Sequence, residues 1–286
     1  KDNSHRTIFV NLGSNPGTIV SALALSDAII RSQPVRLEDN ATSVDAASPI
    51  RVGNMKYGEI LSVSTQKLRD RPWVGGAFAQ TVLNRVLFGL LEGYIHQGDG
   101  CSPREIPVTD LGSLGRLGPD RRDIYDGFNI ERHHTAYAAF WGHNSDEVQK
   151  MAVSPNRWLS PLSQKKPGRN LRNASSLWKL SGRLFLAERM RLNTQAIVAV
   201  RMSEPGLSNV WWPFQLENWS DEKEKALALW LNSTLGLLLF FGNRVPTEGS
   251  WVQFKKPNLQ RTPTLDVEAL DSETIWMLSK GFDELS

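Results

Sequence analysis

Apolar and polar positions in the first part of the chain predict a strand followed by a helix. The apolar run Ile8–Leu12 is typical of a short strand, and Asn15-Pro16-Gly17 is a turn signal. Apolar residues then recur at helical spacing over 20–30, which predicts a helix that stops before Pro34. The polar and small residues over 35–49 predict a loop.

A second strand and a longer helix are predicted next. Residues Tyr57–Val63 have the composition of a strand. From Phe78 to Ile95, apolar residues recur at i, i+3 and i+4, which predicts a long helix with one buried face ending at Gly98. We expect a domain boundary near residues 97–104.

Beyond Pro103 the pattern changes to short apolar runs separated by Gly, Pro and Asn, which predicts a strand-rich domain. The expected strands are Thr135–Phe140, Arg183–Arg189, Gln195–Met202 and Val210–Phe214.

Two helices are predicted within and after this strand-rich region. Ser220 and the acids behind it form a helix start, and the apolar residues from Ala226 to Phe241 continue it as one long buried helix. Its apolar part is about 16 residues long, short of the roughly 20 that cross a bilayer, so no membrane partner is expected. Asp271 is a plausible cap for a closing amphipathic helix. The fold class expected is α+β: an α/β-helical segment, then a strand-rich domain with one long buried helix, then a C-terminal helix.

Composition narrows the class of protein. The chain has 286 residues, 40% of them hydrophobic, which excludes wholesale disorder. Its one cysteine, Cys101, cannot form an internal disulfide, so a cytoplasmic location is expected. Because the chain begins with Lys1 and shows no signal-peptide pattern, we expect a piece of a longer protein.

The net charge of +3 is concentrated in one stretch. Between Met151 and Arg201 there are ten basic residues and one acid, Glu188. Clustered cations neutralise phosphates, and Arg side chains also read guanine edges, so this stretch favours nucleic acid. The alternative is a solvated surface with ordinary salt bridges, whose acidic partners would come from elsewhere in the fold. The candidate DNA-binding residues are Arg121, Arg122, Lys165, Lys166, Arg169, Arg172, Lys179, Arg189, Arg191, Lys255 and Lys256.

Other constellations do not indicate chemistry of their own. The glycines over 111–124 could let backbone amides approach a phosphate, but the segment equally fits a strand that ends in a turn-rich loop. His133, His134 and His143 match no standard ligand spacing, so no metal site is expected. No catalytic residue is assigned either, since a nucleophile motif is absent.

The order of several motifs resembles the C-terminal half of large bacterial N6-adenine DNA methyltransferases of restriction-modification and phage-exclusion systems. The motifs that carry the resemblance cover most of the chain: Arg6–Leu12, Gly58-Glu59-Ile60 with Leu68 and Arg71-Pro72-Trp73, Leu111–Ile124, Ala138–His143 and Leu227–Gly236.

The resemblance implies a target-recognition domain similar to those of type I specificity subunits. Such a domain opens with a Leu-Gly-x-Leu strand and a Gly-rich loop, and closes with a helix ending near Asn-Ser, a Gly-containing hairpin and a Pro-x-Leu strand. Here the closing elements would be 247–251, 255–259 and 262–265. Arg121, Arg122, Lys255 and Lys256 would then lie near the DNA.

The chain departs from this family at the catalytic motif. The Asp/Asn-Pro-Pro-Tyr/Phe tetrapeptide that holds a flipped adenine does not occur, and Asn15-Pro16 is followed by Gly17-Thr18. Methyl transfer and S-adenosylmethionine binding would therefore lie outside this chain, which itself would hold no cofactor. The parts expected are 1–100, the end of a catalytic or connecting region; 101–265, the recognition domain; and 266–286, the closing helix.

The sequence thus predicts a region that recognises double-stranded DNA and positions it for a catalytic methyltransferase domain or subunit. Two alternatives stay open. One is a protein-binding or scaffold domain of a phage-defence complex, and the other is a metal-dependent nuclease that uses His133, His134 and His143.

Overall fold

The computed structural model describes residues 5–37, 48–70, 78, 80–95, 101–142, 147–191, 197–245 and 251–286. The chain forms two compact units, Lys1–Val108 and Thr109–Ser286. Helices and strands are mixed in each unit, so the expected α+β class is confirmed.

The first unit holds a small sheet in the order β1-β4-β2, with β3 also paired to β4. Its elements are β1 (Arg6–Leu12), α1 (Ile19–Arg31), β2 (Val35–Arg36), β3 (Pro49–Val52), β4 (Met55–Ser64), α2 (Thr65–Asp70), α3 (Thr81–Leu91), β5 (Tyr94–Ile95) and β6 (Arg104–Glu105). Helix α1 begins at a capping box in which Thr18 Oγ1 accepts from Ser21 N at 3.1 Å. Its Leu25 packs on Ile50 and Ile60 of the sheet.

Both strands and the first helix predicted for this unit are confirmed, whereas the second helix is shorter than predicted. Helix α3 ends at Leu91. Gly93 follows with φ +86°, and Tyr94–Ile95 then pair with β6 as a strand. The left-handed backbone at Gly93 ends the helix although the apolar spacing continues. Gly98 lies outside the described residues.

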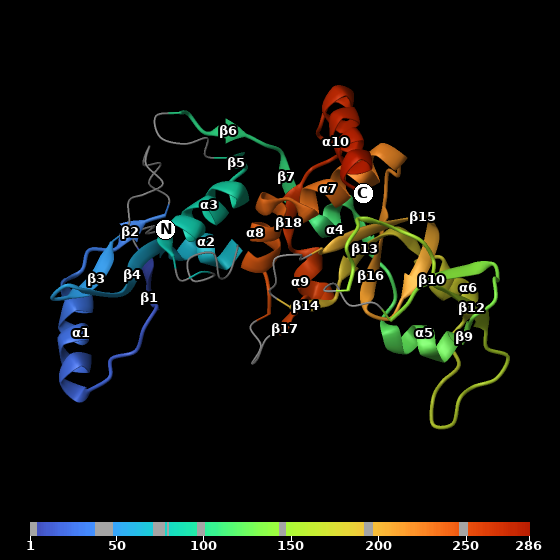
Figure 1. Ribbon diagram of the computed structural model, residues 1–286, viewed down its shortest axis with the longest axis horizontal. Helices are drawn as coiled ribbons and strands as arrows, with labels where there is room; N and C mark the ends of the chain where they lie inside the picture. The colour runs from blue at the N-terminus through green and yellow to red at the C-terminus, as the bar shows by residue number, and fades with distance from the viewer. Residues whose placement is uncertain are drawn as a thin grey trace. The chain divides into compact units, whose positions relative to one another are not determined.

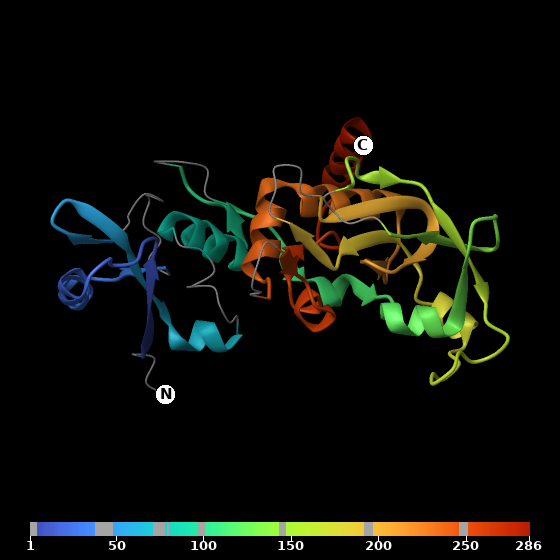
Figure 2. The ribbon, with the colours of Figure 1, turned by 60° about the horizontal axis from the view of Figure 1, so that its bottom comes forward.

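The second unit contains an eight-stranded sheet in the order β8-β16-β13-β15-β10-β12-β9, with β11 paired to β15 (Figures 1 and 2). Its elements, starting with one strand that crosses the boundary, are β7 (Val108–Asp110), α4 (Leu111–Leu114), β8 (Gly115–Leu117), α5 (Arg121–Gly127), β9 (Phe128–Glu131), β10 (Tyr137–Phe140), β11 (Ala152–Val153), β12 (Arg157–Pro161), α6 (Ala174–Trp178), β13 (Gly182–Ala187), β14 (Arg189–Arg191), β15 (Ala199–Ser208), β16 (Trp211–Leu216), α7 (Asp221–Asn232), α8 (Thr234–Gly242), β17 (Trp251–Gln253), α9 (Lys256–Gln260), β18 (Pro263–Leu265) and α10 (Ser272–Leu285).

Alternating side chains divide this sheet into two buried faces. Leu184 and Leu186 of β13 face a core shared with α7, α8 and α10, which lie on that side of the sheet (Figure 1). Phe185 and Ala187 point the opposite way, into a cluster with Val200 of β15. The four strands predicted here correspond to β10, β13, β15 and β16, with shifted ends; residues 192–196, part of one predicted strand, lie outside the described residues.

The predicted long buried helix is two helices, α7 and α8, which meet at 72°. Ser233 ends the first and caps the second, since its Oγ donates to Trp230 O and accepts from Gly236 N. A Cβ on Gly236 would lie 2.0 Å from Trp230 O, so only glycine fits this tight bend. Among the described residues no single helix has the length and apolar character needed to cross a bilayer, and only this bent pair together would reach it.

Candidate nucleic-acid interface

A polar hollow of about 490 Å³ lies on the second unit. Segments far apart in the sequence line it: the start of α5, the loop before α6, the junction between β13 and β14, and the turn from β15 into β16. The lining residues are Pro119, Asp120, Arg121, Arg122, Asp123, Arg172, Glu188, Ser208, Asn209, Trp211 and Trp212. Three of the eleven predicted DNA contacts, all arginines, are thereby brought to one place.

Arg121, Arg122 and Arg172 are exposed at this hollow, while Trp211 and Trp212 are buried. Arg172 Nε pairs with Asp123 Oδ1 at 2.9 Å, which ties the segment before α6 to helix α5. Arginine forks on a concave surface suit phosphate oxygens, because several N–H groups can donate to one anion.

Glu188 is the acid of the hollow that differs most from an ordinary surface carboxylate. Burial raises the pKa of Glu188 and Asp120 adds to this, while the charges of Arg121 and Arg189 oppose it. Its backbone joins two elements, since its N donates to Val210 O and its O accepts from Phe254 N at 2.8 Å. Glu188 therefore marks the point where the hollow meets β14.

Lys256 lies beside the hollow, and its partners are inside the protein. Its Nζ donates to Gly118 O at 2.8 Å and lies 6.0 Å from the centre of the Trp212 ring. Lys255 precedes α9 and is exposed. The segment expected as a closing element at 255–259 is thus mainly a short helix, while Pro263–Leu265 forms the expected strand. Residues 247–250 of the other closing element lie outside the described residues.

The basic loop, residues 162–173 between β12 and α6, is bound to α5. Arg169 Nε pairs with Asp126 Oδ1 at 2.6 Å, and Lys166 Nζ donates to Tyr125 O at 2.6 Å. Lys165 is exposed, as is Lys179 at the end of α6. For Arg169 and Arg172, acidic partners thus come from α5, as expected for a surface with ordinary salt bridges.

Arg189 and Arg191 share one face of β14, which pairs with β17 as a two-stranded ribbon. Both guanidinium groups stack on Trp251, at 4.9 and 4.6 Å from the ring centre. The aromatic residue that orders them comes from a distant part of the sequence.

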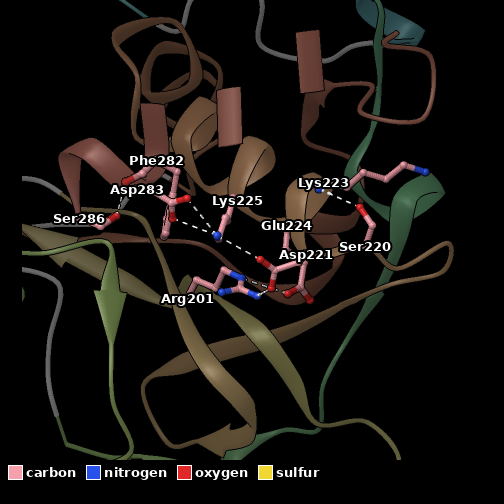
Figure 3. Close-up of polar contacts among 9 residues, drawn as sticks. All are labelled: Arg201, Ser220, Asp221, Lys223, Glu224, Lys225, Phe282, Asp283 and Ser286. Carbon is pink, nitrogen blue, oxygen red and sulfur yellow. Dashed lines mark hydrogen bonds and ion pairs between the residues drawn. The ribbon is translucent and has the colours of Figure 1, made fainter. Parts of the chain in front are cut away.

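Arg201, counted in the basic stretch, faces the protein interior. It is 9% exposed and pairs with Asp221 and with Glu224, the latter at 3.3 Å (Figure 3). Burial raises the pKa of Glu224, against hydrogen bonds from Trp219 and Arg201 and the charges of Arg201 and Arg183. Lys225 extends the network from Asp221 to Asp283 of α10. This arginine fastens α7 to the sheet and offers no surface to DNA.

The Leu-Gly-x-Leu motif differs from its expected form. Leu111–Leu114 is a helical turn, and the strand begins only at Gly115. A Cβ on Gly115 would lie 2.1 Å from Gln215 O on the neighbouring strand. Close strand pairing thus explains this glycine without a phosphate.

The two described histidines of the candidate set, His133 and His134, contact different residues. His133 lies 3.7 Å from Glu131, and the His134 ring lies 5.4 Å from that of Trp158. His143 is outside the described residues. In the part of the chain that is described, no three His, Cys, Asp or Glu side chains are placed to hold a metal ion.

Three polar residues of this region were missed from the sequence. Glu188 and Asn209 line the hollow, and Gln253 lies opposite Arg189 in the ribbon. Glu188, as the lone acid within the basic stretch, carried a signal that could have been used; the other two carried none.

No protein-family model and no curated protein matches the chain. Among solved structures, it is similar to the type IIG restriction endonuclease BpuSI, with 11% identity and a TM-score of 0.39 over 82% of this chain. The chain spans 32% of that protein.

Proposed function

We propose that this chain is the sequence-specific DNA recognition region of an adenine-N6 DNA methyltransferase. In this proposal it holds double-stranded DNA in place for methyl transfer by a catalytic domain or subunit outside the chain, where S-adenosylmethionine would bind. The class of enzyme is suggested by the sequence resemblance alone. The observation that carries DNA binding is the convergence of Arg121, Arg122 and Arg172 on one polar hollow.

In this arrangement the arginines of the hollow contact phosphates. Phosphate contacts fix the position of a protein on the duplex and carry no sequence information themselves. Arg121 and Arg122 stand at the start of α5 with exposed side chains. Lys165 and Lys179, also exposed, would add charge near the same duplex, whereas Arg169 and Lys166 would first support the loop through α5.

Replacing Arg121 and Arg122 with glutamine is expected to weaken duplex binding roughly ten- to a hundredfold, because two charge-assisted contacts to phosphate are lost. The measurement is fluorescence anisotropy with a labelled duplex at fixed salt. Lys280→Gln, on the exposed face of α10, is a control that removes a cation from the helix-covered side of the sheet and should leave affinity unchanged. Equal affinity of the double variant and the wild type, or no binding by the wild type, would contradict the proposal.

A further inference from the structure

The ribbon formed by β14 and β17 has one anchored face and one outward face. Met190 and Val252 lie opposite each other and belong to the main hydrophobic core. Because side chains alternate along a strand, their neighbours point away from that core. The outward face carries Arg189 opposite Gln253 and Arg191 opposite Trp251. Arg191 and Gln253 are exposed.

The outward side chains are ordered before any ligand binds. Trp251 stacks with both guanidinium groups, so each arginine has already lost much of its rotamer freedom. A single β-bridge outside the ribbon also supports β17, because Val245 N donates to Gln253 O at 3.1 Å. Binding to phosphate needs only positive charge. Ordered, planar donors such as these suit recognition of particular base edges.

The ribbon adjoins the hollow. Glu188 lines the hollow and directly precedes β14, and Phe254 directly follows β17. Trp212, at the hollow, donates its indole N–H to Phe254 O at 3.1 Å. The hollow and the ribbon are therefore directly linked through Glu188 and Phe254, so one duplex could contact both.

We infer that the β14–β17 ribbon enters the major groove and reads base edges, with Arg191 and Arg189 donating to guanine and Gln253 pairing with adenine. This inference rests on the proposed function and adds which residues select the sequence. A two-stranded ribbon fits the major groove. Arginine makes paired hydrogen bonds to guanine O6 and N7, and glutamine makes them to adenine N6 and N7. Both side-chain types stand on the same face here.

The test is selection of bound sequences from a pool of random duplexes, carried out with the whole chain. Wild type is expected to enrich a motif. Arg191→Lys keeps the charge but loses the planar fork, so preference for guanine at one position should fall roughly ten- to a hundredfold. Gln253→Ala should relax an adenine position by a similar factor. Affinity for unrelated duplex should change less than about twofold in both variants, since phosphate contacts supply it.

Arg157→Lys on β12, three strands from β13 in the sheet order, is the matched control and should leave the motif unchanged. If wild type enriches a motif and the ribbon variants keep it in full, the ribbon does not read bases, and the proposed function stands. If the variants lose affinity equally for all sequences, the ribbon binds phosphate and the inference is wrong. If wild type binds no duplex, both the inference and the proposed function fail. Thermal melting of each variant confirms that it is folded.

Discussion

Replacing Arg201 with methionine is expected to lower the free energy of unfolding by about 3–5 kcal/mol at neutral pH, because a buried carboxylate then loses its cation. Arg201 is 9% exposed and Glu224 is 2% exposed, so water cannot solvate Glu224 in its place. Asp221 retains Lys225. The measurement is chemical denaturation monitored by the fluorescence of the tryptophans.

The pH dependence of this variant identifies the cause. Burial already raises the pKa of Glu224 above its usual value, and loss of Arg201 raises it further. An acid whose pKa is raised by folding loses stability as the pH rises from its unfolded pKa through its folded pKa, and the loss disappears as the pH falls and both states are protonated. The stability gap between variant and wild type should therefore narrow as pH is lowered from 7 toward 5.

A double variant provides the control for this prediction. Adding Glu224→Gln to Arg201→Met removes the unpaired charge and should recover much of the lost stability. Arg157→Met, at an exposed position on β12, should change stability by no more than about 0.5 kcal/mol. A loss in Arg201→Met that neither pH nor Glu224→Gln reduces would show that packing, and not charge, is responsible.

Replacing Asn232 with alanine is expected to lower the free energy of unfolding by about 3 kcal/mol or more, since its side chain joins α7 to the start of β15. Asn232 Oδ1 accepts from Val198 N and Ala199 N, and Nδ2 donates to Ala199 O and Ala228 O. Val198 and Ala199 are fully buried, so their amides would find no water. Each buried polar group left unpaired costs about 1–3 kcal/mol.

Asn243→Ala is the matched control for this substitution. Asn243 Nδ2 makes one hydrogen bond of the same kind, to Leu239 O at 2.8 Å, near the end of α8. Its removal should cost about 1 kcal/mol. If the two variants unfold at the same denaturant concentration, Asn232 does not have the role we assign to it. The Leu-Asn-Ser-Thr-Leu-Gly motif, part of the sequence resemblance, would then lack its structural explanation.

Periodicity predicted the helices and strands well where local signals agree with the tertiary structure. Helix α1 follows its apolar spacing and its cap, and α10 begins at Asp271 as expected, with Asp271 Oδ1 accepting from Thr274 N. The break between α7 and α8 was missed because hydropathy continues through it. Ser233 bends the chain through side-chain hydrogen bonds, which a hydropathy pattern does not record.

The candidate site was predicted in its residue types but not in its arrangement. The charge count singled out the stretch that contains Arg172, Arg189 and Arg191. It could not separate Arg201, which faces two acids of α7, from cations at the surface. Contacts between residues far apart in the sequence determine whether an arginine is buried or exposed. Such contacts also place Trp251 against Arg189 and Arg191.

The two ion pairs that join α5 to the basic loop also bear on how salt would act on the site. Asp123 and Asp126 already sit beside Arg172 and Arg169, as counter-ions built into the chain. A phosphate that approached these arginines would displace a carboxylate, and that exchange releases no dissolved ion. The number of ions freed on binding would then be smaller than the number of cations near the duplex. The affinity for DNA would then fall only slowly as the salt concentration rises, although the region carries many basic residues.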